Sequence, residues 1–281
     1  MLNSKKQTRI NHIVTYFSLA LFSIYCLFPF VWMVISALKP KAEIRTANPT
    51  FYIKNATFEN FTKVLFDTGF VGFMKNSLVV SVFSTLISLV IAIFAGYALS
   101  RYSRQQYVKV THIGMLVSQM VPGVLLLVPL YLIMQKFKLL DSYYSLILAY
   151  TTFVIPLCTF MMSSFFDTIP YSLEEAAEVD GCGKLKTIFT IIIPVSIPSI
   201  ISTGLYAFIS AWNEFMFGYT FISVDKFKTI TPAIMLYRGA NITDWGGLMA
   251  TSVLAVLPVT VIFLFLQKYY MSGLLSGSVK G

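Results

Sequence analysis

Six long stretches nearly free of charge constrain what this sequence can fold into. They cover residues 13–38, 76–100, 113–135, 142–166, 198–219 and 245–267, and Glu214 is the one charged residue inside them. A helix needs roughly 20 apolar residues to cross the hydrocarbon core of a bilayer. We therefore predict an all-α integral membrane protein with six transmembrane helices, organised as one domain over residues 1–281.

The composition agrees with a lipid environment. Apolar residues make up 57% of the chain and charged residues 12%, whereas soluble domains carry about 25% charged residues. The net charge of +9 comes from basic residues scattered at the ends of the apolar stretches. They form no basic face with interleaved aromatic residues, so nucleic acid is excluded as a partner. The three cysteines lie far apart in the sequence and predict neither disulfides nor a metal site.

The charges around the spans leave the orientation open. An even number of spans places both termini on the same side of the membrane. Three basic residues precede the first span and three more lie in 101–109, but 39–45, on the opposite side, also contains three. Since cytoplasmic loops usually carry the excess of Lys and Arg, the count leans only weakly towards cytoplasmic termini.

The connections between the spans differ in kind. Residues 39–75 and 223–244 read as two outer loops, and the region around the second contains a mixture of aromatic and polar residues, Tyr237, Arg238, Asn241 and Trp245. The connection 167–197 is different, because it has the pattern of two short amphipathic helices.

The first of these helices starts near Ser172. The segment Ser172–Glu175 has the form of a capping box, in which the serine and glutamate side chains each accept from an amide of the first turn. Leu173, Ala176 and Ala177 then form a narrow apolar stripe. Gly181 follows, and a glycine just past a helix end commonly takes the left-handed conformation that closes the helix.

The second helix carries a full apolar stripe, formed by Leu185, Ile188, Phe189 and Ile192. Pro194 follows and bends the chain towards the fifth span. Helices this short are not stable alone in water, so each must bury its stripe on another surface. That surface is either the protein's own helix ends, the lipid interface or a second protein.

The same segment resembles a known signature. Glu175–Ala177, three residues, Gly181, nine residues and Ile191-x-Ile193-Pro194 are similar to the EAA motif of permease subunits of binding-protein-dependent ABC importers. The resemblance implies that 167–197 is a cytoplasmic helix-Gly-helix coupling loop whose first helix sits in a cleft of the ATPase subunit. It also implies that the partner is an ABC ATPase dimer and that both termini are cytoplasmic. The residues it assigns to this coupling are Glu174, Glu175, Ala176, Ala177, Asp180, Gly181, Leu185, Phe189 and Pro194.

Particular roles follow from the resemblance. Glu175 is expected to form an ion pair or a cap at the joint with the ATPase, although a purely local cap is the alternative. The two alanines allow close approach, and Gly181 sets the bend. The chain contains no Gly-x-x-x-x-Gly-Lys-[Ser/Thr] segment, so we expect ATP hydrolysis in a partner and neither catalytic residues nor a cofactor in this chain.

Two further segments narrow the resemblance to a subgroup. Ala211–Phe215 and the ending 272–281 are similar to carbohydrate-importer permeases of the maltose-transporter type, on the side of the shorter subunit. This implies a bacterial or archaeal cytoplasmic membrane, a sister permease and an extracytoplasmic solute-binding protein, which Tyr237, Arg238, Asn241 and Trp245 would contact. It also implies that the tail 276–281 reaches the ATPase pair.

Glu214 is a candidate for the substrate path. Charged residues inside a span usually face a cavity or a partner. Together with Tyr206, Trp212 and Asn213 it would offer aromatic faces and polar groups suited to a hydroxyl-rich ligand. The alternative is an interfacial glutamate bonded to a neighbouring helix or to the sister subunit.

Two other functional classes remain open at this level. An ion-coupled secondary transporter or channel would favour paired charges within the membrane, and Glu214 is alone there. A membrane enzyme would have to use the acidic residues of 174–180, which have no histidine or serine arranged with them for catalysis.

Overall fold

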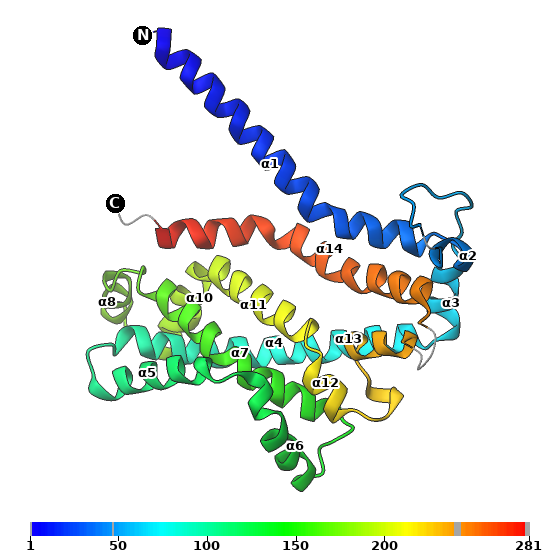
Figure 1. The fold of residues 1–281 in the computed structure, drawn as a ribbon. Coiled ribbons are helices and arrows are strands. Elements are labelled where there is room, and N and C mark those ends of the chain that lie inside the picture. The colour runs from blue at the N-terminus through cyan, green and yellow to red at the C-terminus, as the bar shows by residue number, and fades with distance from the viewer. Residues whose placement is uncertain (1, 47, 239–242, 279–281) are drawn as a thin grey trace. The chain divides into compact units, whose positions relative to one another are not determined.

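The computed structural model describes residues 2–46, 48–238 and 243–278 of the chain. The described chain is helical apart from loops and one isolated antiparallel bridge between Arg238 and Thr243, which confirms the all-α prediction (Figure 1). Two compact units are present, one formed by 1–70 and 234–257 and the other by 71–233 and 258–281. The α-helices are, in order, α1 (Leu2–Ala37), α2 (Lys41–Ile44), α3 (Glu59–Asp67), α4 (Phe70–Arg101), α5 (Gln106–Met120), α6 (Leu127–Lys136), α7 (Tyr143–Phe166), α8 (Ser172–Val179), α9 (Lys184–Thr187), α10 (Ile193–Val195), α11 (Ile197–Trp212), α12 (Met216–Phe221), α13 (Ile230–Ala233) and α14 (Trp245–Ser278).

Short helical turns of other kinds connect some of these helices. Three are 3₁₀ turns, η1 (Gly123–Leu126), η3 (Asp225–Phe227) and η4 (Ile234–Tyr237), and one, η2 (Ile188–Ile192), is a π-helical turn. The π turn continues α9 directly into α10, so 184–195 runs as one helical segment.

Four helices are long and apolar enough to cross a membrane, namely Asn11–Ala37, Phe70–Arg101, Tyr143–Phe166 and Trp245–Lys268. They correspond to the first, second, fourth and sixth predicted spans, with ends displaced by a few residues. Two further helix pairs reach the required apolar length only if each bent pair is counted as one span. The described residues therefore contain four uninterrupted candidate spans, or six with both bent pairs included.

The third predicted span, 113–135, is not one continuous helix. Helix α5 ends at Met120, and the chain turns by 92° before it continues through η1 into α6. Val121 has an extended backbone, with φ −80° and ψ 117°. Pro122 explains this, because a proline disfavours helical geometry in the residue before it and has no amide hydrogen to donate.

The fifth predicted span, 198–219, is also interrupted. Helix α11 ends at Trp212, and α12 starts afresh at Met216. At its other end α11 meets the segment 184–195 at an angle of 79°. Ser196 stands at this bend, where its Oγ donates a 2.7 Å hydrogen bond to the Ile192 carbonyl, which also accepts from the Ser196 amide at 3.0 Å.

The core of the second unit forms where α7 packs along α11. Cys158, Met162 and Phe166 of α7 are fully buried together with Ile192 and with Ala92 of α4. Gly96 of α4 lies so close to α7 that a Cβ atom there would be 2.8 Å from the Cβ of Met162. Small residues permit this kind of close helix contact in membrane proteins.

Asn60 organises the first unit, at the end of α1. It is almost fully buried, and its Nδ2 donates to the carbonyls of Ala37 at 2.8 Å and Lys39 at 2.9 Å. The last carbonyls of a helix have no partner within the helix. Asn60 therefore caps α1 from helix α3, which lies more than 20 positions along the chain.

Replacing Asn60 by leucine is expected to loosen this cap. The substitution keeps the volume similar but leaves two carbonyls without their donor, at a cost of roughly 1–3 kcal/mol for each buried group. Faster hydrogen exchange of the amides near the end of α1 should report the loss. Asn55→Leu, at an exposed position of the same unit, serves as the control; equal exchange in the two variants would contradict the capping role.

Candidate functional site

The connection between α7 and α11 has the helix-Gly-helix form predicted for it. Helix α8 occupies 172–179, Gly181 follows, and the segment 184–195 forms the second helix. Gly181 has φ +80°, which confirms the left-handed helix stop. The amide of Cys182 then bonds to the Ala177 carbonyl at 2.8 Å, and this bond satisfies an acceptor at the end of α8.

The predicted capping box is wrong in its geometry. Ser172 is the first residue of α8 rather than its cap, and the preceding Tyr171 already has helical angles. The amides of Glu174 and Glu175 bond to the Tyr171 carbonyl at 2.9 and 3.0 Å. Because a backbone turn after Pro170 satisfies these first donors, no side-chain acceptor is needed.

Both predicted apolar stripes are divided between two surfaces. Ala177, Ile188 and Ile192 are buried against the rest of the chain. Leu173, Leu185 and Phe189 remain exposed, with Leu185 at 66% and Phe189 at 58% of full exposure. The loop therefore packs partly on its own protein and presents the remaining apolar side chains outwards.

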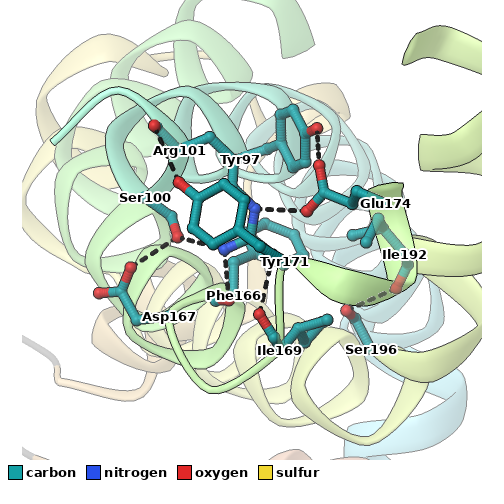
Figure 2. A network of polar contacts seen from close by, with 10 residues as sticks. All are labelled: Tyr97, Ser100, Arg101, Phe166, Asp167, Ile169, Tyr171, Glu174, Ile192 and Ser196. Atoms are coloured by element: carbon teal, nitrogen blue, oxygen red, sulfur yellow. Dashed lines mark hydrogen bonds and ion pairs between the residues drawn. The ribbon is translucent and has the colours of Figure 1, made fainter. Parts of the chain in front are cut away.

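A polar network holds α8 against the end of α4 (Figure 2). Arg101 Nε donates to Glu174 Oε1 at 2.5 Å, and Tyr97 Oη donates to Glu174 Oε2 at the same distance. The other guanidinium nitrogens of Arg101 donate to the carbonyls of Phe166 at 2.8 Å and Ile169 at 3.2 Å. The Arg101 side chain is only 5% exposed and that of Glu174 15%, so this is a largely desolvated ion pair.

The two neighbouring glutamates of α8 thus have different environments. Glu174 turns inwards to Arg101, whereas Glu175, the residue expected at the joint with a partner, is exposed. Ala176 and Asp180 are exposed as well, and Pro194 lies exposed in α10. Glu175 is therefore accessible to a second protein, while Glu174 is engaged in an ion pair within this chain.

Sequence reasoning missed Arg101, Tyr97, Ser100 and Asp167. Ser100 Oγ donates to Asp167 Oδ1 at 2.5 Å beside the arginine. An arginine at the end of a long apolar stretch reads as an ordinary charge at the membrane border, and its partner Glu174 is 73 positions away. The three glutamates of α8, Glu174, Glu175 and Glu178, gave no indication of which one would turn inwards.

Glu214 performs a local structural task. Its carboxylate accepts from the amides of Phe217 at 2.9 Å and Gly218 at 3.0 Å, and so caps α12. Trp212 is buried and stacks on Phe208, with ring centroids 5.6 Å apart. Tyr206 is half-buried and packs against the core around Met162, whereas Asn213 is exposed. The predicted path residues therefore do not all face one open cavity.

The residues predicted to contact a binding protein fall into two groups within the first unit. Tyr237 Oη is 2.9 Å from Thr68 Oγ1, and its ring leaves no room for a side chain at Gly247, so it is a packing residue. Arg238 and Trp245 are exposed. Asn241 lies outside the residues that the structure describes.

An ion pair between Lys63 and Asp244, 2.7 Å apart, supports this loop. Partial burial acts to raise the pKa of Asp244, but hydrogen bonds from Lys63 and the Gly247 amide outweigh it and hold that pKa below its usual value. The hydrogen bond to Asp244 raises the pKa of Lys63. Both groups are therefore charged at neutral pH.

A family model now fits these observations. Residues 88–274 match the family described as the binding-protein-dependent transport system inner membrane component. The chain belongs to this family. The match includes α7, the whole helix-Gly-helix loop, α11 and most of α14. The protein is thus a membrane-spanning permease subunit of an importer. This assignment is favoured over the two alternatives, an ion-coupled transporter and a membrane enzyme.

Curated relatives extend the similarity over nearly the full length. The permease is 33% identical to a sulfoquinovosyl glycerol transport system permease of Agrobacterium fabrum, over 91% of this chain and 89% of the relative. It is also 33% identical to a trehalose/maltose transport system permease of Thermococcus litoralis, over 93% of this chain and 94% of the relative. An inner membrane ABC transporter permease of Escherichia coli is 34% identical over 97% of this chain.

Solved structures share the fold. A bacterial ABC transporter involved in the import of the polysaccharide alginate superposes with a TM-score of 0.79, at 22% identity, over 93% of this chain and 97% of its own. A methionine ABC transporter superposes with a TM-score of 0.56, at 16% identity, over 73% of this chain and 94% of its own. The permease fold therefore extends beyond the segment that the family model matches.

Proposed function

We propose that this permease, as one transmembrane domain, forms half of the translocation path for a sugar or oligosaccharide in an ATP-driven importer. The sister permease supplies the other half, and an extracytoplasmic binding protein delivers the solute. Relatives named for trehalose and maltose and for sulfoquinovosyl glycerol support a glycoside substrate. The path is proposed to pass the break between α11 and α12, where Asn213 is exposed beside Glu214.

The exposed apolar residues of the coupling loop support a separate ATPase as its partner. Leu173, Leu185 and Phe189 present apolar side chains that water solvates poorly, and each gains about 1.5–3 kcal/mol when it is fully buried. Exposed Glu175 and Asp180 border them. We assign this surface to a cleft in the ABC ATPase dimer.

This assignment also sets the orientation. An ATPase that uses cellular ATP must meet the loop on the cytoplasmic side. With an even number of crossings, both termini are then cytoplasmic, and the loops 39–75 and 223–244 are extracytoplasmic. Exposed Arg238 and Trp245 are the described residues proposed to meet the binding protein.

Replacing Phe189 by aspartate tests the docking surface. We expect the amount of ATPase that co-purifies with the permease to fall at least about ten-fold, because a charged group would be buried in an apolar cleft. Thr190→Asp introduces the same charge at the next exposed position of the same turn and should retain the ATPase. Equal retention by both variants would show that this face is not the docking surface.

The sugar assignment has its own test. Vesicles containing the complete importer and its binding protein should accumulate a labelled sugar when ATP is enclosed on the loop side. Accumulation of amino acids or ions, with no uptake across a panel of mono- and oligosaccharides, would contradict the sugar assignment while leaving the permease assignment intact.

A further inference from the structure

We propose that Arg101 is a positioning residue that makes α4, the end of α7 and α8 move as one body. The movement of a docked ATPase would then reach two membrane helices together. This inference rests on the proposed docking of 167–197 to an ATPase, and it concerns the inner face of the loop rather than the face that meets the partner.

The contacts of Arg101 join three elements. Its side chain extends from the last residue of α4 and donates to Glu174 of α8, to the Phe166 carbonyl at the end of α7 and to the Ile169 carbonyl beyond it. A guanidinium offers five N–H donors in a rigid planar fork. A lysine at this position could keep the charge, but it could not reach these acceptors in the same geometry.

The linker between α7 and α8 is held at both ends by the same turn of α4. Asp167, directly after α7, accepts from Ser100. Tyr171, directly before α8, donates from its hydroxyl to the Arg101 carbonyl at 3.0 Å, and its ring lies over the guanidinium with the Cζ atom 4.6 Å from the ring centroid. Figure 2 shows these residues gathered around the arginine.

The Arg101–Glu174 pair lets a displacement of α8 reach α4 directly. Residues 167–171 form a short linker of turns between α7 and α8 that could otherwise bend and absorb a displacement of α8. With Arg101 in place, a push on α8 acts directly on the end of α4 through a pair of charges that are both largely removed from water. Such a pair resists separation more strongly than an exposed one.

The test uses the complete importer in vesicles and compares sugar uptake with ATP hydrolysis per assembled complex. For Arg101→Lys and Glu174→Gln we expect the ratio of sugar transported to ATP hydrolysed to fall at least about ten-fold. The ATPase that co-purifies should stay within about two-fold of the unsubstituted complex. Hydrogen exchange of the amides in 167–171 should become faster in both variants.

Two matched controls make the result specific. Arg104→Lys and Glu178→Gln repeat the same chemical changes at exposed positions nearby in the sequence, and neither should accelerate exchange in the linker. An unchanged transport ratio in Arg101→Lys and Glu174→Gln would overturn the inference, as would loss of ATPase assembly in both, which would indicate a purely structural role. Failure of the unsubstituted permease to bind any ATPase would instead contradict the proposed docking.

Discussion

Replacing Gly181 by valine should reduce solute uptake at least ten-fold. The backbone at this position has φ +80°, a conformation that costs a residue with a side chain about 1–2 kcal/mol and a β-branched residue more. A change of 1.4 kcal/mol shifts an equilibrium ten-fold. The turn between α8 and the second loop helix would therefore open. Exposed Leu173 on α8 would then no longer be held in a fixed orientation to exposed Leu185 and Phe189 on the second helix.

Gly183→Val is the matched control for this prediction. Within the part of the chain that the structure describes, no atom lies within 4 Å of a Cβ built at either glycine. Gly183 has φ −72°, which any residue adopts easily. Gly181→Asn should keep most of the uptake, because asparagine tolerates the left-handed conformation. Equal loss in Gly181→Val and Gly183→Val would point to steric conflict with a partner instead of backbone strain.

Replacing Gly96 by alanine is expected to destabilise the second unit. The new Cβ atom would lie 2.8 Å from the Met162 Cβ and 2.9 Å from the backbone nitrogen of Ser163. Backbone atoms cannot rotate away as a flexible side chain can, so α4 and α7 would have to separate. Overpacking of this kind costs about 1–3 kcal/mol, and the loss should appear as a lower unfolding temperature of the purified permease.

Gly72→Ala controls for the change in helix propensity. Gly72 lies in the same helix, and among the described residues nothing is within 4 Å of a Cβ atom built there. Alanine is a better helix former than glycine, so this variant should be as stable as the unsubstituted protein or slightly more stable. The same unfolding temperature for both alanine variants would contradict the close contact between α4 and α7.

The sequence predicted where the spans lie, but not where their helices are interrupted. Charge-free stretches identified α1, α4, α7 and α14 because a bilayer-spanning helix must be apolar over a known length. The same criterion overlooked the break at Pro122 and the end of α11 at Trp212. Hydrophobicity records which residues can lie in lipid or in a protein core, and it does not record whether the backbone remains helical there.

The helix-Gly-helix loop 167–197 shows which features the sequence determines and which need the folded chain. The sequence alone determined the helix-Gly-helix form and the stop at Gly181, since both depend on conformational preferences of neighbouring residues. Only the tertiary structure decided which half of each apolar stripe is buried and which is exposed, and that Glu174 rather than Glu175 turns inwards. Those outcomes depend on Arg101 and the ends of α4 and α7, which lie far away in the sequence and meet the loop only when the chain has folded.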